Sequence, residues 1–260
     1  MSFQPDPLWQ SIRDEVERAA RQEPLLASFL HMTVLRHACF EDMLAFHLSS
    51  KLACNVMDGR ALYELLCEGF DADPHLADAA RADLTACFDR DPACDAYSTP
   101  LLYFKGYHAL QSYRVTHWLW NAGRVSLALF LQNRVSESMG VDIHPAARFG
   151  RGILLDHATG FVAGETAVVG DNVSILQGVT LGGTGKECGD RHPKIGAGVL
   201  LGAGAKVLGN IRIGEGVKVG AGSVVLDDVP PHVTVAGVPA RIVGQSAEDM
   251  PALEMNHKLG

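Results

Sequence analysis

The sequence predicts an α+β protein, in which an all-helical N-terminal domain is followed by a parallel β-helix built from six-residue repeats. Three observations support this prediction. Residues 1–139 contain four glycines, whereas residues 140–244 contain twenty-two. All three tryptophans and all five tyrosines precede residue 121. From residue 143 onward an apolar side chain recurs at every sixth position, a period that an α-helix of about 3.6 residues per turn does not produce.

The first half carries signals for helices and for their starts. Apolar residues spaced four positions apart near the N-terminus are typical of an amphipathic helix; they are Leu8, Ile12 and Val16. In STPLLYFKGYHALQSYRVTHWLW we expect Thr99 to be an N-cap and Pro100 the first helical residue. Asp73–Pro74 and Asp91–Pro92 predict further helix starts or turns.

The second half shows its period of six in two runs. The first run is Ile143, Phe149, Leu155, Phe161, Ala167, Val173 and Val179, and the second is Ile195, Leu201, Val207, Ile213, Val219 and Val225. We expect the sixth residue to point inward, with three repeats per triangular coil and coils about 4.8 Å apart. Four to five coils fit this length. Val179 and Ile195 are sixteen residues apart, ten more than the period requires, so residues 182–193 should form an extruded loop.

The same patterns divide the chain into three parts. Residues 1–139 form the helical domain, residues 140–245 the β-helix domain, and residues 246–260 a C-terminal tail. A solenoid leaves unpaired strand edges at both ends, so each end needs a cap. We expect the helical domain to cap one end, and VPPHVTVAGVPARIVG together with the tail to cap the other.

Composition excludes several classes of partner. The chain of 260 residues is 47% apolar with a formal net charge of −8, which argues against nucleic acid and against an anionic membrane surface. The acidic N-terminus lacks an apolar core, so we expect no signal peptide, and no apolar run is long enough to span a membrane. The six cysteines are scattered without a CxxC pair, which favours free thiols and a reducing cytoplasm.

One polar pair stands out among the small residues of the repeats, Asp156 and His157 in GILLDHATG. By strand alternation Leu155 points inward, so Asp156 points outward and His157 lies at the following corner. A solvated surface pair would fit this pattern, and so would a catalytic site. Asp142 precedes His157 by fifteen residues, three short of one coil, which would let its carboxylate approach across a corner. Such a carboxylate can hold an imidazole in the state that a general base needs.

The extruded loop is the second candidate feature. A loop that interrupts a strict repeat is more often functional than not. It carries Arg191 and His192, and we expect the ten extra residues to bring this arginine toward the edge with Asp156 and His157. Arginine is suited to binding a carboxylate through two hydrogen bonds. The alternative is that Arg191 pairs with Asp190 or Glu187 and only stiffens the loop.

Four segments carry a resemblance to a known family. They are YSTPLLYFKGYHALQSYRVTHWLWNAGR, VDIHPAARFGRGILLDHATGFVAGETAVVG, VSILQGVTLGGTGKECGDRHPKIGAGVLLGAGAKVLGNIRIG and VVLDDVPPHVTVAGVPARIVG. Together they resemble the serine O-acetyltransferases, over roughly residues 5–245 and including the helical domain. The resemblance implies that the β-helix is left-handed. It also implies transfer of acetyl from acetyl-CoA to the hydroxyl of L-serine, the step that commits serine to cysteine biosynthesis.

The resemblance also implies roles for single residues. The family's general base falls on His157 and its orienting acid on Asp142. Asp91 and Asp156 match positions that contact serine, where carboxylates suit the ammonium group. Arg191 and His192 match the positions that bind the serine carboxylate.

Acetyl-CoA is the co-substrate that the resemblance implies, and no metal is expected. Gly183 and Thr184 in the loop match CoA-binding positions, as do Ala203 and Ala221, eighteen residues apart on successive coils. Lys218, like Lys206, is a candidate for the CoA phosphates, although a solvated lysine fits the pattern as well.

The resemblance further implies a homo-oligomer built on trimers, with active sites between neighbours and helical domains pairing trimers into a hexamer. Outward apolar residues of the coil fit such contacts, and we expect Val162, Val168 and Ile175 among them. Many family members end in an isoleucine that inserts into O-acetylserine sulfhydrylase. This chain ends in EMNHKLG, and Gly260 in place of that isoleucine argues against the complex.

Three other functions remain compatible with the sequence. A metalloenzyme similar to the γ-type carbonic anhydrases needs three convergent histidines, and the repeats offer His144, His157, His192 and His232 without a close pair. A non-catalytic solenoid would need neither the loop nor the Asp–His pair. Another acyl-CoA transferase acting on a sugar or an antibiotic would share the fold, but the helical half and GDRHPK favour serine.

Overall fold

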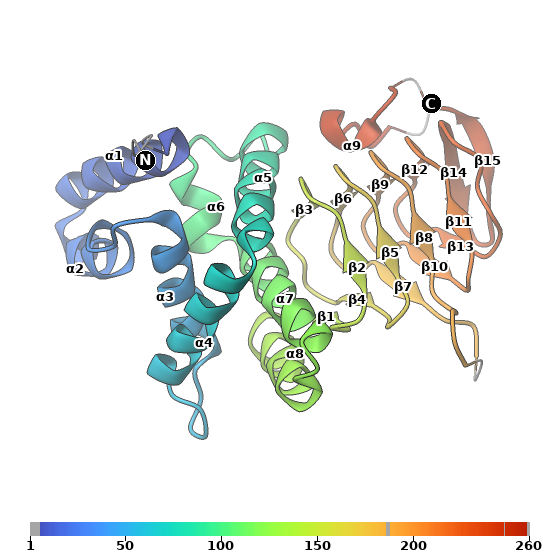
Figure 1. The fold of residues 1–260 in the computed structure, drawn as a ribbon. Coiled ribbons are helices and arrows are strands. Elements are labelled where there is room, and N and C mark those ends of the chain that lie inside the picture. The colour runs from blue at the N-terminus through green and yellow to red at the C-terminus, as the bar shows by residue number, and fades with distance from the viewer. Residues whose placement is uncertain (1–5, 186–187, 247, 259–260) are drawn as a thin grey trace.

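The computed structural model describes residues 6–185, 188–246 and 248–258, and it consists of a helical half followed by a β-solenoid (Figure 1). Gly260 lies outside the described residues. The helical half contains α1 (Pro7–Gln22), a 3-10 turn (Pro24–Leu26), α2 (Ala27–Leu30), a π-helical turn (His31–Leu35), α3 (Phe40–Leu52), α4 (Gly59–Ala72), α5 (Pro74–Arg90), α6 (Ser98–Tyr103), α7 (Lys105–Asn121) and α8 (Val125–Met139). No helix in the described part of the chain is long and apolar enough to cross a membrane.

The helix starts at Asp6 and Asp73 follow the expected capping chemistry, whereas the start expected at Thr99 does not. Asp6 caps α1 by accepting hydrogen bonds from the backbone of Leu8 and Trp9, and Asp73 caps α5 in the same way. Asp91 ends α5 and opens the turn expected at Asp91–Pro92, in which Cys94 N–H donates to the carbonyl oxygen of Asp91, at 2.9 Å. The helix expected from Pro100 onward is interrupted at Phe104, and Thr99 lies inside α6 rather than at its cap.

The solenoid consists of short strands in three sheets. The strands are β1 (Val141–Ile143), β2 (Arg148–Phe149), β3 (Leu154–Leu155), β4 (Phe161–Ala163), β5 (Val168–Val169), β6 (Ser174–Ile175), β7 (Thr180–Gly182), β8 (Lys194–Ile195), β9 (Leu200–Leu201), β10 (Lys206–Leu208), β11 (Arg212–Ile213), β12 (Lys218–Val219), β13 (Val224–Val225), β14 (Val233–Gly237) and β15 (Ala240–Gln245). Sheet 1 has the order β1-β4-β7-β10-β13, sheet 2 β2-β5-β8-β11, and sheet 3 β3-β6-β9-β12-β14-β15.

Every pairing except that of β14 with β15 is parallel, which confirms the predicted parallel β-helix of about five coils. Two edges of this prism carry the candidate functional residues. The first corner comprises the turns that lead from sheet 3 to sheet 1, after β3, β6, β9 and β12. The second corner comprises the turns that lead from sheet 1 to sheet 2, after β1, β4, β7 and β10.

The register shows that the extra residues occur in two places and not in one. Val141 pairs with Phe161, twenty residues further on, whereas Val162 pairs with Thr180 after the expected eighteen. Thr180 then pairs with Lys206 after twenty-six. Two of the ten extra residues therefore lie in the turn after Leu155, and the extruded loop holds only eight.

The period of six concealed this shift because each repeat has two inward positions, two residues apart. Phe161 and Ala163 are both buried, as are Val179 and Leu181. After this turn, the residues of the first run occupy the other of the two inward positions, so the run remains apolar. The expectation that Ile175 points outward is therefore wrong, since it is fully buried.

A buried ion pair within the helical half joins this half to the solenoid through further hydrogen bonds. Asp83 of α5 accepts hydrogen bonds from Arg114 of α7, at 2.7 and 2.9 Å, and from the backbone N–H of Ile153, at 2.9 Å. Arg114 also donates to the carbonyl oxygen of Gly150, at 2.7 Å. The helical half thus caps the first coil, as predicted.

The other end of the solenoid is covered by the β14–β15 hairpin (Figure 1). The tail does not continue this cap as expected. Its helix α9 (Pro251–Glu254) turns back along sheet 3, where the Ser174 hydroxyl donates to the carbonyl oxygen of Ala252, at 2.8 Å. The tail consequently approaches α5.

Candidate active site

The turn after β3 contains the two extra residues and has an unusual backbone. His157 and Ala158 both have positive φ angles, 54° and 61°, a conformation that residues other than glycine seldom adopt. Consecutive residues of this kind cost about 1–3 kcal/mol each and persist only where the surroundings hold them. Ala158 is fully buried, and the His157 side chain is 73% exposed. The inserted turn therefore lifts the imidazole out of the solenoid surface.

The N-terminus of α7 holds this turn from the helical side. A Cβ atom on Gly106 would lie 1.9 Å from the carbonyl oxygen of Leu155 and 3.1 Å from Ala158 Cβ. The Lys105 ammonium donates to the Thr159 hydroxyl. Neither Gly106 nor Lys105 was expected at the site. The sequence feature that could have indicated them is the glycine in YFKG, in the first turn of a helix.

Asp91, Asp156 and His157 come together where the two halves meet. They line a cavity of about 300 Å³ together with Tyr103 and Lys105. His157 Nδ1 lies 3.8 Å from Asp156 Oδ1. Burial raises the pKa of the Asp156 carboxyl; the charge of His157 works against this rise and that of Asp91 adds to it. Two neighbouring carboxylates of this kind suit a bound cation.

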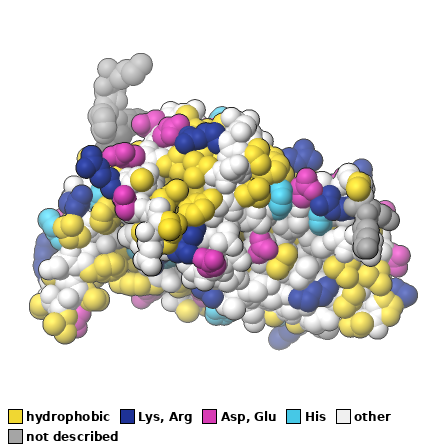
Figure 2. Space-filling model, turned by 90° about the horizontal axis from the view of Figure 1, so that it is seen from below, with side chains coloured by type: hydrophobic (Ala, Val, Ile, Leu, Met, Phe, Trp, Pro, Cys, Tyr) yellow, Lys and Arg dark blue, Asp and Glu magenta, His cyan; other side chains and the backbone are white. Residues whose placement is uncertain are grey.

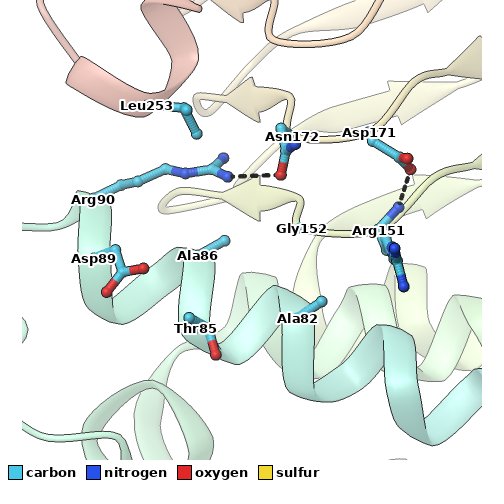
Figure 3. A pocket seen from close by; sticks show the side chains of 10 residues that line it. All are labelled: Ala82, Thr85, Ala86, Asp89, Arg90, Arg151, Gly152, Asp171, Asn172 and Leu253. Atoms are coloured by element: carbon cyan, nitrogen blue, oxygen red, sulfur yellow. Dashed lines mark hydrogen bonds between the residues drawn. The ribbon is translucent and has the colours of Figure 1, made fainter.

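A second cavity, of about 550 Å³, lies between α5 and the solenoid (Figure 3). Arg90 points into it toward Asn172 of the solenoid, and only 7% of this arginine is exposed. Its guanidinium donates to the Ser174 hydroxyl, at 3.1 Å, and to Asn172 Oδ1, at 3.4 Å. Because Arg90 immediately precedes Asp91, these bonds fix the end of α5 against the solenoid.

The loop between β7 and β8 builds a separate polar cluster at the second corner. Arg191 Nη2 donates to Glu165, at 2.7 Å, and the described residues give it no ion pair with Asp190, which pairs with Lys194. Glu187 lies outside the described residues. The His192 ring lies over Gly164, where an added Cβ would be 1.9 Å from Nε2. Burial lowers the pKa of His192, and the charge of Arg191 lowers it further.

The two groups of expected site residues are therefore at different edges of one chain. Neither Arg191 nor His192 lines the cavity with Asp91, Asp156 and His157. The expectation that the loop carries Arg191 to that edge does not hold within a single chain. The loop instead extends beside its own corner, because its anchor residues Glu165 and Thr166 lie there.

Asp142 lies on β1, two residues past the first corner. Gly140 belongs to this corner, since its carbonyl accepts a hydrogen bond from Gly160 N–H, at 2.8 Å. The Asp142 carboxylate accepts from Gln132 Nε2, at 2.7 Å, and among the described ion pairs none joins Asp142 to His157.

The expected CoA-binding residues show the same division. Ala203 and Ala221 lie at the first corner on successive coils, where Gly222 N–H donates to the carbonyl oxygen of Ala203, at 2.8 Å. Gly183 and Thr184 lie at the second corner, at the start of the loop.

Lys218 is neither solvated nor open to a groove. It is 4% exposed, and its ammonium contacts Glu248, at 3.4 Å, and the carbonyl oxygen of Lys258, at 3.2 Å. The tail therefore covers this lysine.

Within residues 6–185, 188–246 and 248–258, no group of three or more His, Cys, Asp or Glu side chains is placed to hold a metal ion. All six cysteines are free thiols. What the geometry offers is an exposed imidazole beside two carboxylates at one edge, and an arginine with a buried histidine at another.

Comparison with known proteins gives consistent results. Residues 8–112 match the family model for the N-terminal region of serine acetyltransferase, and residues 192–227 match the bacterial transferase hexapeptide repeats. The chain is 59% identical to a serine acetyltransferase of Salmonella typhimurium over 249 residues, which cover 96% of this chain and 91% of that protein.

Two solved structures are informative about ligands. A Neisseria gonorrhoeae serine acetyltransferase in complex with serine is 61% identical, with a TM-score of 0.90 over 92% of this chain and 98% of that one. A Brucella abortus serine acetyltransferase in complex with coenzyme A is 51% identical, with a TM-score of 0.92 over 94% and 97%.

Proposed function

The chain belongs to the serine acetyltransferase family, and from this we propose how its own residues carry out the reaction. It transfers acetyl from acetyl-CoA to the hydroxyl of L-serine and releases O-acetyl-L-serine and CoA. The observation that carries the proposal is the cavity where Asp91 and Asp156 face the exposed His157. Relatives that hold serine and coenzyme A support the two substrates.

We assign the serine ammonium to Asp91 and Asp156. Two carboxylates on one small cavity stabilise a cation, and each comes from a different half of the chain. The bond from Arg90 to Ser174 supports this role, because it fixes Asp91 relative to the solenoid. A bound ammonium would also offset the repulsion between the two acids.

We assign the general base to His157. Its imidazole accepts the hydroxyl proton as the serine oxygen attacks the thioester carbonyl carbon. The tetrahedral intermediate then collapses, the C–S bond breaks, and the imidazolium returns the proton to the CoA thiolate. Asp142 is proposed as the acid that orients this imidazole, which requires it to exchange its present bond with Gln132.

We assign the serine carboxylate to Arg191 and His192. Because these lie at the second corner, we propose that the complete site forms between two protomers, with the first corner of one against the second corner of its neighbour. When three protomers surround a common axis, the first corner of each one meets the second corner of a neighbour. The CoA-binding residues Ala203 and Ala221, and Gly183 and Thr184, would meet in the same gap.

Surface composition supports an assembly. Val162 on the outer face of sheet 1 is 37% exposed, and Val168 beside it on sheet 2 is partly exposed. Apolar side chains gather over both the helical half and the solenoid in Figure 2. Large exposed side chains at the N-terminal end of the helical half suit the pairing of trimers into a hexamer; they are Leu25, Leu26, Phe29 and Met32.

We propose the functional division 1–139, 140–245 and 246–260, of which residues 1–5, 186–187, 247 and 259–260 lie outside the described part. The helical domain supplies Asp91 and supports the His157 turn. The solenoid supplies the base and the loop. Free cysteines and two water-soluble substrates favour a cytoplasmic enzyme.

The test is acceptor specificity. The purified protein should release CoA thiol from acetyl-CoA at a rate that depends on L-serine, with homoserine and galactosides as poor acceptors. Faster release with a galactoside than with serine would contradict the proposal.

A further inference from the structure

We propose that Thr166 is a positioning residue for recognition of the serine carboxylate, because it sets the tautomer of His192 and places the backbone of Arg191. This rests on the proposed function of the loop. Thr166 lies at the second corner between β4 and β5, one coil before the loop. Sequence reasoning did not single it out, because its partners are twenty-five and twenty-six residues away.

The backbone of Thr166 decides where the proton of His192 lies. Thr166 N–H donates to His192 Nδ1, at 3.1 Å. A backbone N–H can only donate, so Nδ1 is an acceptor and carries no proton. The ring proton is therefore on Nε2, the atom that faces Gly164.

The Thr166 hydroxyl makes the same assignment independently. Its oxygen accepts the backbone N–H of Arg191, at 3.0 Å, and that of His192, at 3.1 Å. These two donors occupy both lone pairs, so the hydroxyl hydrogen is free to donate to Nδ1, at 2.9 Å. One threonine side chain thereby uses its full hydrogen-bonding capacity on the loop.

The consequence is that His192 is a neutral donor. Protonation would place a hydrogen on Nδ1 against two donors from Thr166, and burial also disfavours the charged ring. The charged groups around this ring act in both directions; they are Arg191, Glu165, Lys194 and His144.

Nε2 is the ring atom left for a ligand. Among the described residues it has no hydrogen-bond partner, and it is not one of the fully buried unpartnered atoms. A carboxylate would thus meet one N–H of a neutral imidazole and one guanidinium, in a fixed arrangement.

The neighbouring contacts keep this arrangement rigid. Lys194 Nζ donates to the carbonyl oxygen of Thr166, at 3.1 Å, where the loop rejoins the coil. Glu165 accepts from Arg191 Nη2. The dipeptide Glu165–Thr166 therefore determines both the side chain of Arg191 and the ring of His192.

The experiment compares Thr166→Val with Thr166→Ser. Valine has the same shape but removes the hydroxyl and leaves the N–H groups of Arg191 and His192 without their acceptor, whereas serine keeps it. For Thr166→Val we expect KM for serine to rise roughly 10- to 100-fold, with KM for acetyl-CoA within about twofold. Thr166→Ser should stay within about threefold of the unchanged enzyme. Equal KM values for the two variants, or a parallel rise for both substrates, would overturn the inference.

Two further readouts separate the loss of the hydroxyl donor to His192 Nδ1 from simple damage to the loop, since Thr166→Val keeps the backbone N–H donor. Without the hydroxyl His192 protonates more readily, so the ratio of KM for serine between Thr166→Val and Thr166→Ser should fall as pH is lowered from 8 to 6. His192→Gln keeps an N–H near Nε2 but has no tautomers, so adding Thr166→Val to it should have a smaller effect than in the unchanged enzyme. A ratio independent of pH together with additive effects would overturn the inference.

The proposed function is judged by other measurements. Serine-dependent release of CoA and a rise in KM for serine in Arg191→Ala test it directly. If these succeed while Thr166→Val behaves like Thr166→Ser, only the role of Thr166 fails.

Discussion

The carbonyl oxygen of Leu155 lies 1.9 Å from the position that a Cβ atom on Gly106 would occupy. Helix α7 therefore rests directly on the backbone that leads into Asp156 and His157. Its close approach needs a residue without a side chain, and the oxygen belongs to the backbone and cannot rotate away.

Gly106→Ala should consequently reduce kcat roughly 10- to 100-fold, because the added methyl group pushes the His157 turn away from α7. Overpacking should also lower the free energy of unfolding by about 1–3 kcal/mol. The matched control is Gly59→Ala at the start of α4, where the nearest atoms are 3.8 Å away. The same loss of kcat in both variants would contradict the role given to the contact.

His157→Ala should lower kcat by roughly 10²–10⁴ while the affinity for acetyl-CoA is largely kept, since a positioned base typically contributes that factor. Steady-state kinetics and CoA binding by calorimetry measure the two effects. Asp142→Asn should be less damaging, because that acid only orients the base. Near-normal turnover of His157→Ala would exclude it as the base.

Arg191→Ala should raise KM for serine about 10- to 150-fold and leave that for acetyl-CoA nearly unchanged, as expected for one lost hydrogen bond to a charged group of about 1.5–3 kcal/mol. Arg191→Lys should restore only part of the loss, because an ammonium does not reproduce two parallel bonds. If Arg191 only stiffens the loop through Glu165, the KM values for both substrates should change together.

Mixed oligomers test whether the site is shared. His157→Ala protomers keep a working loop, and Arg191→Ala protomers keep a working base. When the two are co-assembled in equal amounts, about one quarter of the sites should combine both intact halves if neighbours meet as proposed. Activity at low serine should then exceed that of either variant alone. Activity no higher than the mean of the two variants, or a monomer in sedimentation at micromolar concentration, would speak against a shared site.

Acid should weaken the helical half through two buried histidines. Burial lowers the pKa of His108 to about 3 and that of His47 to about 4, from 6.5. Below pH 6.5 the unfolded chain binds protons that the folded chain does not, so the free energy of unfolding falls as pH drops toward 4. The slope is at most about 1.4 kcal/mol per pH unit for each histidine.

Urea unfolding at pH 7.5, 6.0 and 5.0 measures this slope. His108→Gln should flatten it, and His75→Gln, at an exposed position on α5, should leave it unchanged. A midpoint that does not move between pH 7.5 and 5.0 would show that the two buried rings do not govern acid stability.

The architecture could be predicted from the sequence because a solenoid repeats its inward residues. Thirteen apolar positions in two runs indicated the parallel coil, and the interrupted run located the loop. The two-residue insertion at the His157 turn escaped this reasoning, because Phe161 and Ala163 are both inward and apolar. Helix boundaries were harder to place: Thr99 has the features of a cap, but packing starts α6 at Ser98 and breaks the helix at Phe104.

The site was predictable as a set of residue types and not as an arrangement. Asp156 and His157 are adjacent in sequence, so their proximity followed directly. The contacts of Thr166 with His192, and of Lys105 with Thr159, join distant segments and depend on the register of the coils. No local pattern indicates that Arg191 and His157 lie at different corners, since this depends on where the eight loop residues leave the prism.

The hydrogen bond that the N–H of Ile153 donates to Asp83 bears on how this protein can be engineered. It caps the edge of the first coil with a charge that is itself neutralised by Arg114. Cutting the chain near residue 140 would leave that N–H and the carbonyl oxygen of Gly150 without their partners. The first coil would then expose an unpaired edge that can pair with other chains. The solenoid is therefore a poor module for transplantation. A chimera that borrows its acetyl-transfer chemistry has to take α5 and α7 along with it.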